Sequence, residues 1–137
     1  MATAKITYTG DLSTEAIHVK SGAKIITDAP VDNNGLGRSF SPTDLVATAL
    51  GSCILTIMGI KARGKNIDMV GATVDVQKTM GSGPRHIETL EVAITMPANG
   101  YSEKERKVLE GSAHHCPVAN SLADGIEVLS IKWLDDE

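Results

Sequence analysis

Residues 41–64 read SPTDLVATALGSCILTIMGIKARG, and this stretch decides the fold. Its first residues carry the signals of a helix N-terminus. Ser41 can cap the helix, Pro42 suits the first helical position, and Asp44 places a negative charge where the helix dipole favours one. Basic residues and Gly64 at the far end predict that the helix stops there, with Gly64 as its C-cap.

Apolar side chains cover more than one stripe of this predicted helix. They are Leu45, Val46, Ala49, Leu50, Cys53, Ile54, Ile57, Met58 and Ile60. A helix that is apolar nearly all round must be surrounded by protein. A chain of 137 residues can hardly enclose a long helix alone. The pattern therefore predicts that the helix is buried in a dimer.

The apolar stretch, residues 45–60, is shorter than the ~20 residues that a membrane span needs. Small and polar residues also interrupt it, so we expect the buried helix of a soluble domain. The formal net charge is −4 and the chain has no run of Lys or Arg, which argues against a nucleic-acid partner. The length fits a single domain, residues 1–137. The N-terminus shows no secretory signal, so we expect the protein in the cytoplasm.

The other segments predict strands and shorter helices around the long helix. Alternating residues and turn signals indicate strands at 4–9, 16–20 and 24–27 before it, and at 72–79 and 85–96 after it. A capping box at Ser102 starts a helix to about residue 112, and Cys116 with Pro117 starts a second one to about residue 124. The last strand is expected at 127–134. The order βββ-α-ββ-α-α-β predicts an α+β fold with strands on both sides of a buried helix.

The two cysteines lie in contrasting surroundings. Cys53 is inside the apolar helix, where burial favours a neutral thiol, whereas Cys116 starts a helix, where amide groups and the dipole favour a thiolate. Cys53 alone could be a small buried apolar residue, because free cysteine is among the most buried residue types. If the fold brings the two thiols together, they can reduce an oxidant and close a disulfide. In a reducing cytoplasm that disulfide is expected to be transient and catalytic.

Two histidines precede the second cysteine, in His114-His115-Cys116. Adjacent histidines point in different directions on most backbones, and no further Cys/His cluster completes a set of metal ligands. We therefore expect neither a metal nor a cofactor.

Two motifs give the chain a family resemblance: residues 41–45 with 49–54, SPTDL and ALGSCI, and residues 116–118, CPV, with Leu122 behind them. In this order and at this separation, they resemble the osmotically inducible protein C / organic hydroperoxide resistance (OsmC/Ohr) family, of which the chain looks like a divergent member. The resemblance implies an intertwined homodimer whose strands wrap two long central helices, with two equivalent active sites at the subunit interface. It also implies thiol-dependent reduction of organic hydroperoxides in oxidative or osmotic stress defence.

The same resemblance assigns roles to the cysteines. Cys53 is the peroxidatic thiol, which attacks the peroxide and becomes a sulfenic acid, and Cys116 is the resolving thiol, which condenses with that sulfenic acid to a disulfide. A dithiol reductant then restores the pair, and in relatives of this kind it is commonly a lipoylated protein. Homodimerisation, an organic hydroperoxide and a dithiol are the implied partners.

The sequence departs from the family pattern beside the peroxidatic thiol. Thr43 stands where active relatives carry a glutamate that positions an activating arginine, and Asp44 is one position on, turned by about 100° on a helix. Arg38 is our candidate for that arginine and Arg85 is the second choice. The missing glutamate favours an alternative function, in which the protein binds or senses an apolar small molecule in a pocket at the dimer interface without catalysis.

Overall fold

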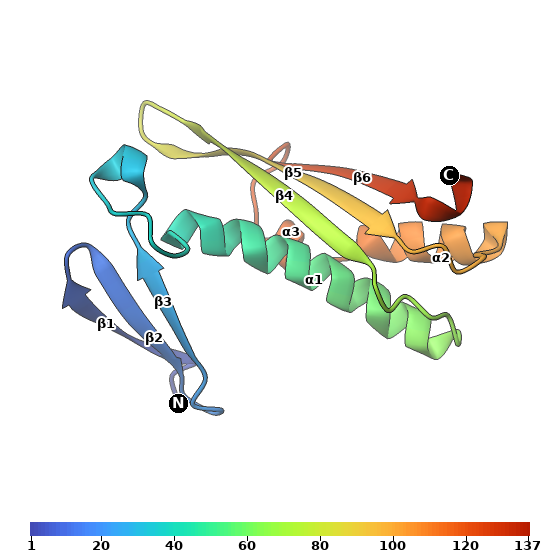
Figure 1. Ribbon diagram of the computed structural model, residues 1–137, viewed down its shortest axis with the longest axis horizontal. Coiled ribbons are helices and arrows are strands. Elements are labelled where there is room, and N and C mark those ends of the chain that lie inside the picture. Colours follow the sequence, from blue (N-terminus) through green and yellow to red (C-terminus); the bar gives the residue numbers. More distant parts are fainter. The chain divides into compact units, whose positions relative to one another are not determined.

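The computed structural model describes residues 1–137 and has the element order βββ-α-ββ-α-β, with a four-residue helix before the last strand (Figure 1). This confirms the α+β class and the predicted order of elements. The chain divides into two compact units, Met1–Val46 and Ala47–Glu137. The long helix α1 (Pro42–Gly64) begins in the first unit and continues through the second.

The first unit is an antiparallel meander of β1 (Ala4–Gly10), β2 (Ser13–His18) and β3 (Lys24–Asp28). The second strand starts three residues before its predicted position at 16 and ends at His18, so the predicted range 16–20 was wrong. The reason is the tight turn before it: Asp11 and Leu12 both adopt left-handed backbone angles, which lets pairing resume at Ser13. A one-turn helix, η1 (Val31–Asn33), follows β3.

This first sheet has no apolar core of its own. All of the buried residues within Met1–Val46 are polar, namely Ser13, Thr27, Asp28 and Ser41. Ile6 pairs with Ala16 and Ala16 with Ile25, so the three share one face of the sheet. On that face Ile6 and Ile25 are 60% and 51% exposed. The sheet therefore carries an apolar face that nothing in this chain buries.

The second unit contains the apolar core. Its sheet has the order β4-β5-β6, with β4 (Thr73–Gly81) antiparallel to β5 (His86–Met96) and β5 parallel to β6 (Glu127–Trp133). Figure 1 shows α1 running along one face of this sheet. The core side chains that are fully buried are Leu50, Ile54 and Met58 of α1, Leu90, Val92, Ile94 and Met96 of β5, and Leu109 of the next helix.

Both ends of α1 are capped by local interactions. The Asp44 backbone N–H donates to Ser41 Oγ at 3.1 Å and the Ser41 N–H donates to Asp44 Oδ2 at 2.9 Å, which confirms the predicted start. The helix ends at Gly64 as expected, but Gly64 is not the capping residue. Asn66 takes the left-handed conformation, and the N–H of Ile67 reaches back to the carbonyl of Ala62 at 2.8 Å.

One stripe of α1 is covered within the chain, and the rest of the helix is not. The stripe consists of Ala47, Leu50, Gly51, Ile54, Met58 and Ala62. Ile60 is 57% exposed. Within the most apolar 18-residue stretch of α1, only 33% is buried. The 23-residue helix is long and apolar enough to cross a membrane, so our expectation that it is too short was wrong. Core helices of globular proteins meet the same two criteria. The predicted enclosure of α1 on all sides thus requires more protein than one chain supplies.

Two shorter helices precede β6. Helix α2 (Glu103–Ala113) has the predicted capping box, in which Ser102 Oγ accepts from the Glu105 N–H and the Glu105 side chain accepts from the Ser102 N–H. Helix α3 (Pro117–Asn120) is shorter than predicted. Its continuation to residue 124 was wrong, because the backbone bonds that follow span three residues and form turns. A last helical turn, η2 (Leu134–Asp136), ends the chain.

The close approach of α1 to β4 at Gly51 yields a prediction. A Cβ at this position would lie 2.9 Å from Val76 Cγ2 and 3.2 Å from Val74 Cγ1, so Gly51→Ala requires the valine side chains or the helix to shift. We expect it to lower the free energy of unfolding by about 1–3 kcal/mol, measured by urea denaturation. Gly59→Ala in the same helix meets no atom within 4 Å and should raise it by about 0.5–1 kcal/mol. Equal effects of the two substitutions would refute the tight packing.

Candidate active site

The two cysteines come together in the second unit. Cys53 lies on α1 beside the buried stripe and is half-buried, whereas Cys116 is fully buried at the start of α3. The thiols are hydrogen-bond partners, and both are free. The structure therefore places an accessible thiol against an enclosed one, within a single chain.

Cys116 is the N-cap of α3, and its Sγ accepts a hydrogen bond from the Ala119 N–H at 3.4 Å. Our expectation that this position favours a thiolate is wrong, because the pKa of Cys116 is raised. Burial is the main cause and the hydrogen bond with the Cys53 thiol adds to it, while the amides of Ala119 and Val118 offset only part of the rise. A four-residue helix supplies few aligned peptide dipoles. At neutral pH Cys116 is a neutral thiol, which can donate its S–H to the sulfur of Cys53.

The predicted arginine lies in the first unit, where it is bound to a buried carboxylate. Arg38 Nε donates to Asp28 Oδ2 at 3.0 Å and Arg38 Nη2 donates to Asp28 Oδ1 at 3.2 Å, so the guanidinium binds both carboxylate oxygens. The Arg38 backbone N–H also donates to Oδ2 at 2.8 Å, and the Ser13 hydroxyl donates to Oδ1. Only 1% of the Asp28 side chain is exposed, whereas 58% of the Arg38 side chain is. The guanidinium is thus held in orientation while much of its surface stays open.

These contacts fix the charge on both partners. The hydrogen bonds from the Arg38 guanidinium, and then that from Ser13, hold the pKa of Asp28 well below its usual range. The same carboxylate raises the pKa of Arg38. The stability that Asp28 contributes is therefore complete above its ordinary pKa of 3.8 and is lost as the pH falls toward its lower value in the folded protein.

Asp28 is the partner of Arg38 that the sequence did not reveal. Its role depends on strand register, since pairing of β2 with β3 sets Ser13 opposite Asp28. An acidic residue at the end of a strand carries no sequence signal for such a role; only the pairing shows which hydroxyl and which guanidinium meet it.

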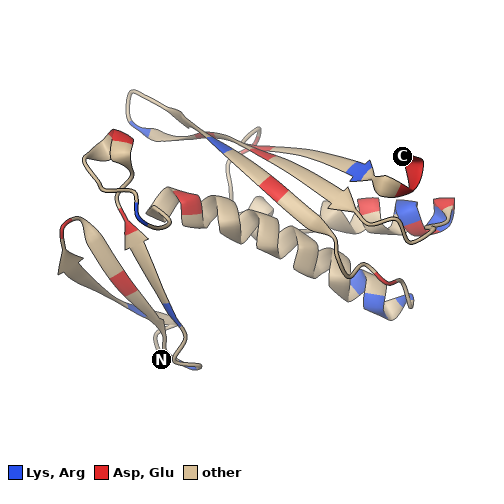
Figure 2. Ribbon diagram, in the orientation of Figure 1, with Lys and Arg blue, Asp and Glu red and all other residues tan.

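The other candidate residues, Thr43, Asp44 and Arg85, have different surroundings. Asp44, considered as a replacement for the family glutamate, is part of the capping box of α1, and Thr43 Oγ1 lies 3.2 Å from Ser41 Oγ. Arg38 has Asp28 as its carboxylate instead. Arg85, the second choice of cation, is exposed in the turn before β5. Figure 2 shows that α1 carries no charged residue between its first turn and Lys61.

The histidines do not form a metal centre. His114 and His115 are exposed, and no group of three or more His, Cys, Asp or Glu side chains is arranged to hold a metal ion.

The chain is similar to known proteins both in sequence and in structure. The sequence profile of the OsmC-like protein family matches residues 35–130. A crystal structure from Psychrobacter arcticus 273-4, provisionally assigned as an osmotic stress induced and detoxification response protein, is 47% identical and superposes with a TM-score of 0.88. The match covers 97% of this chain and 96% of that one. Among curated protein sequences, none matches the chain.

More distant structures share the fold. The organic hydroperoxide resistance protein OsmC from Legionella pneumophila is 19% identical with a TM-score of 0.68, and covers 97% of each chain. An organic hydroperoxide resistance protein from Elizabethkingia anophelis is 17% identical with a TM-score of 0.70, covering 97% of this chain and 96% of that one. At these identities the likeness is one of fold.

Proposed function

The chain belongs to the OsmC-like protein family, and from that premise we propose that it reduces organic hydroperoxides through Cys53 and Cys116. The observation that carries this proposal is the hydrogen-bonded contact between the two thiols. Support also comes from the family, which includes organic hydroperoxide resistance proteins of the same fold. The reaction would serve stress defence in the cytoplasm, where the thiols start reduced.

The unequal burial of the thiols assigns their roles in this proposal. Cys53 is half-buried and can meet a substrate, so its thiolate attacks the outer oxygen of the hydroperoxide. The O–O bond breaks, the alkoxide takes a proton and leaves as the alcohol, and Cys53 becomes a sulfenic acid. Cys116 is enclosed, so substrate does not reach it directly.

Resolution then uses the contact that already exists. Cys116 loses its proton and attacks the sulfur of the Cys53 sulfenic acid, forming the S–S bond and releasing water. The raised pKa of Cys116 keeps it protonated until that step, because burial disfavours the free thiolate. A dithiol reductant, which we propose is a small dithiol or a lipoylated protein, then takes the disulfide and returns both thiols.

A thiol titration tests the reaction. One equivalent of cumene hydroperoxide should remove two titratable thiols from the wild-type protein as a disulfide, within minutes. In Cys116→Ser the same treatment should leave a sulfenic acid at Cys53, detectable by mass spectrometry after dimedone trapping. Cys53→Ser is the matched control and should not react.

The alternative function makes the opposite forecast. If the protein only binds or senses an apolar molecule, both thiols remain titratable in denaturant after hours with the hydroperoxide. That result would remove the peroxidase proposal, even if the hydroperoxide binds.

Arg38 is the cation that we propose activates Cys53, with Asp28 as the carboxylate that orients it. Arg38→Ala should slow oxidation of Cys53 by cumene hydroperoxide by at least about tenfold, which corresponds to about 1.4 kcal/mol in the barrier. Arg85→Ala is the matched control and should leave the rate unchanged. An unaltered rate in Arg38→Ala, with the fold verified by circular dichroism, would exclude Arg38 from the mechanism.

We also propose that the protein is a homodimer whose subunits cover each other's apolar surfaces. Two such surfaces support this: the exposed face of the first sheet, with Ile6, Tyr8 and Ile25, and the uncovered side of α1 around Ile60. Exposed apolar faces of this kind mark protein interfaces.

Sedimentation of two sheet variants tests the dimer. Ile6→Lys places a charge on the apolar face and should shift the protein toward monomer. Thr7→Lys places the same charge on the other face of the same strand, where Thr7 pairs with Glu15 of β2, and this variant should stay dimeric. A monomeric wild-type protein at micromolar concentration would contradict the proposal.

A further inference from the structure

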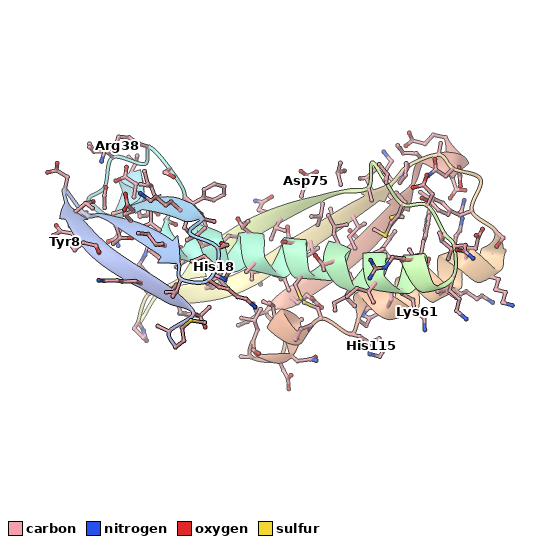
Figure 3. The ribbon with its side chains drawn as sticks, turned by 90° about the horizontal axis from the view of Figure 1, so that it is seen from below. Tyr8, His18, Arg38, Lys61, Asp75 and His115 are labelled. Carbon is pink, nitrogen blue, oxygen red and sulfur yellow. The ribbon has the colours of Figure 1, made fainter.

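Cys116 is buried by its own chain, and this burial restricts how its sulfur can be approached. The residue has 0% exposure, although its neighbours His115 and Pro117 are both exposed. Figure 3 shows the side chain of His115 at the outer edge of the unit. The segment therefore lies at the surface while the Cys116 side chain points inward. A second copy of the chain could only add to this burial.

Groups of the same chain surround the Cys116 sulfur. The backbone N–H of Ala119, in the first turn of α3, donates to Cys116 Sγ at 3.4 Å. The end of α2 that precedes this segment is also buried, at Ser112 and Ala113. A molecule from solvent thus has no open approach to Cys116 Sγ, whereas Cys53 is only half-buried.

This difference bears on the disulfide that the two cysteines can form. A thiolate attacks a disulfide in line with the S–S bond, so the attacked sulfur must be open on the side away from its partner. For Cys116 that side lies within the unit, so access favours attack at Cys53. Cys116 is then the leaving group. The Ala119 N–H already donates to its sulfur, and such a hydrogen bond strengthens when the acceptor becomes an anion.

We propose that the reductant of the oxidised protein attacks the sulfur of Cys53, so that the mixed disulfide forms on Cys53 and Cys116 is the leaving group. This inference rests on the proposed function, in which the two cysteines form a disulfide. One approach, to Cys53, then serves both the oxidant and the reductant, and Cys116 stays enclosed throughout the cycle.

The reduction has two exchange steps. A thiolate of the reductant forms an S–S bond with Cys53 Sγ, the bond between Cys53 and Cys116 breaks, and the Cys116 thiolate takes up a proton from water. The second thiol of a dithiol reductant, once deprotonated, attacks the reductant's own sulfur in the mixed disulfide. This closes a cyclic disulfide and releases Cys53 as a thiolate. The reductant loses two electrons and the protein gains two.

Trapping of the mixed disulfide in the wild-type protein tests this assignment. Diamide, which oxidises thiols without a hydroperoxide, forms the disulfide. A brief reaction with the monothiol 2-mercaptoethanol is stopped with N-ethylmaleimide in acidic denaturant, and peptide mass spectrometry locates both labels. We expect 2-mercaptoethanol on Cys53 and N-ethylmaleimide on Cys116, at least about tenfold more abundant than the opposite pattern.

The same disulfide unfolded in urea before the reaction is the matched control. Unfolding exposes both sulfurs, so both patterns should then appear in comparable amounts. A preference for Cys53 that is equally strong in urea would show that local chemistry and not burial directs the attack, and would overturn the proposal.

Three further results would also overturn it: the adduct mainly on Cys116 in the folded protein, equal amounts of the two patterns there, or failure of diamide to join the two cysteines. No hydroperoxide enters this experiment, so its outcome is separate from that of the titration with cumene hydroperoxide. Thiols that resist the hydroperoxide would remove the proposed function, while an adduct on Cys53 after diamide would still support this assignment.

Discussion

The packing of α1 against its sheet is the constraint on which the rest of the structure depends. A glycine at position 51 lets the helix approach Val74 and Val76 of β4, and Leu50, Ile54 and Met58 fill the core on the same side. Because this face of α1 packs against the sheet, Cys53 lies beside the buried residues of the helix, where it is half-buried and interacts with Cys116. The contact between the thiols is therefore a consequence of how the helix is seated, and not of any local property of either cysteine.

The first unit follows a different physical logic. It has no apolar core, and its buried groups are a carboxylate and hydroxyls. Asp28, Ser13 and Arg38 satisfy one another, so that a charge can be buried at the end of β3 at little cost. The apolar residues of the same sheet face outward instead. This exposed apolar face is the physical basis of the dimer that we propose.

Much of the architecture could be predicted because it depends on local signals. The Ser41 and Ser102 capping boxes, the end of α1 at residue 64 and the alternation of β4 and β5 follow from short-range rules, and the structure confirms them. The errors arose where backbone geometry overrides residue pattern. Two successive left-handed residues moved the start of β2, Asn66 rather than Gly64 adopted the capping conformation, and three-residue turns cut α3 short.

By itself the sequence determined the order of the elements, the length and polarity of the central helix and the presence of two thiols in dissimilar settings, because each depends on residues close together in the chain. Only the tertiary structure decided that the thiols touch, that burial outweighs the helix N-terminus and raises the pKa of Cys116, and that Arg38 pairs with Asp28. These outcomes depend on desolvation and on pairing between distant segments. Neither quantity exists until the chain has folded.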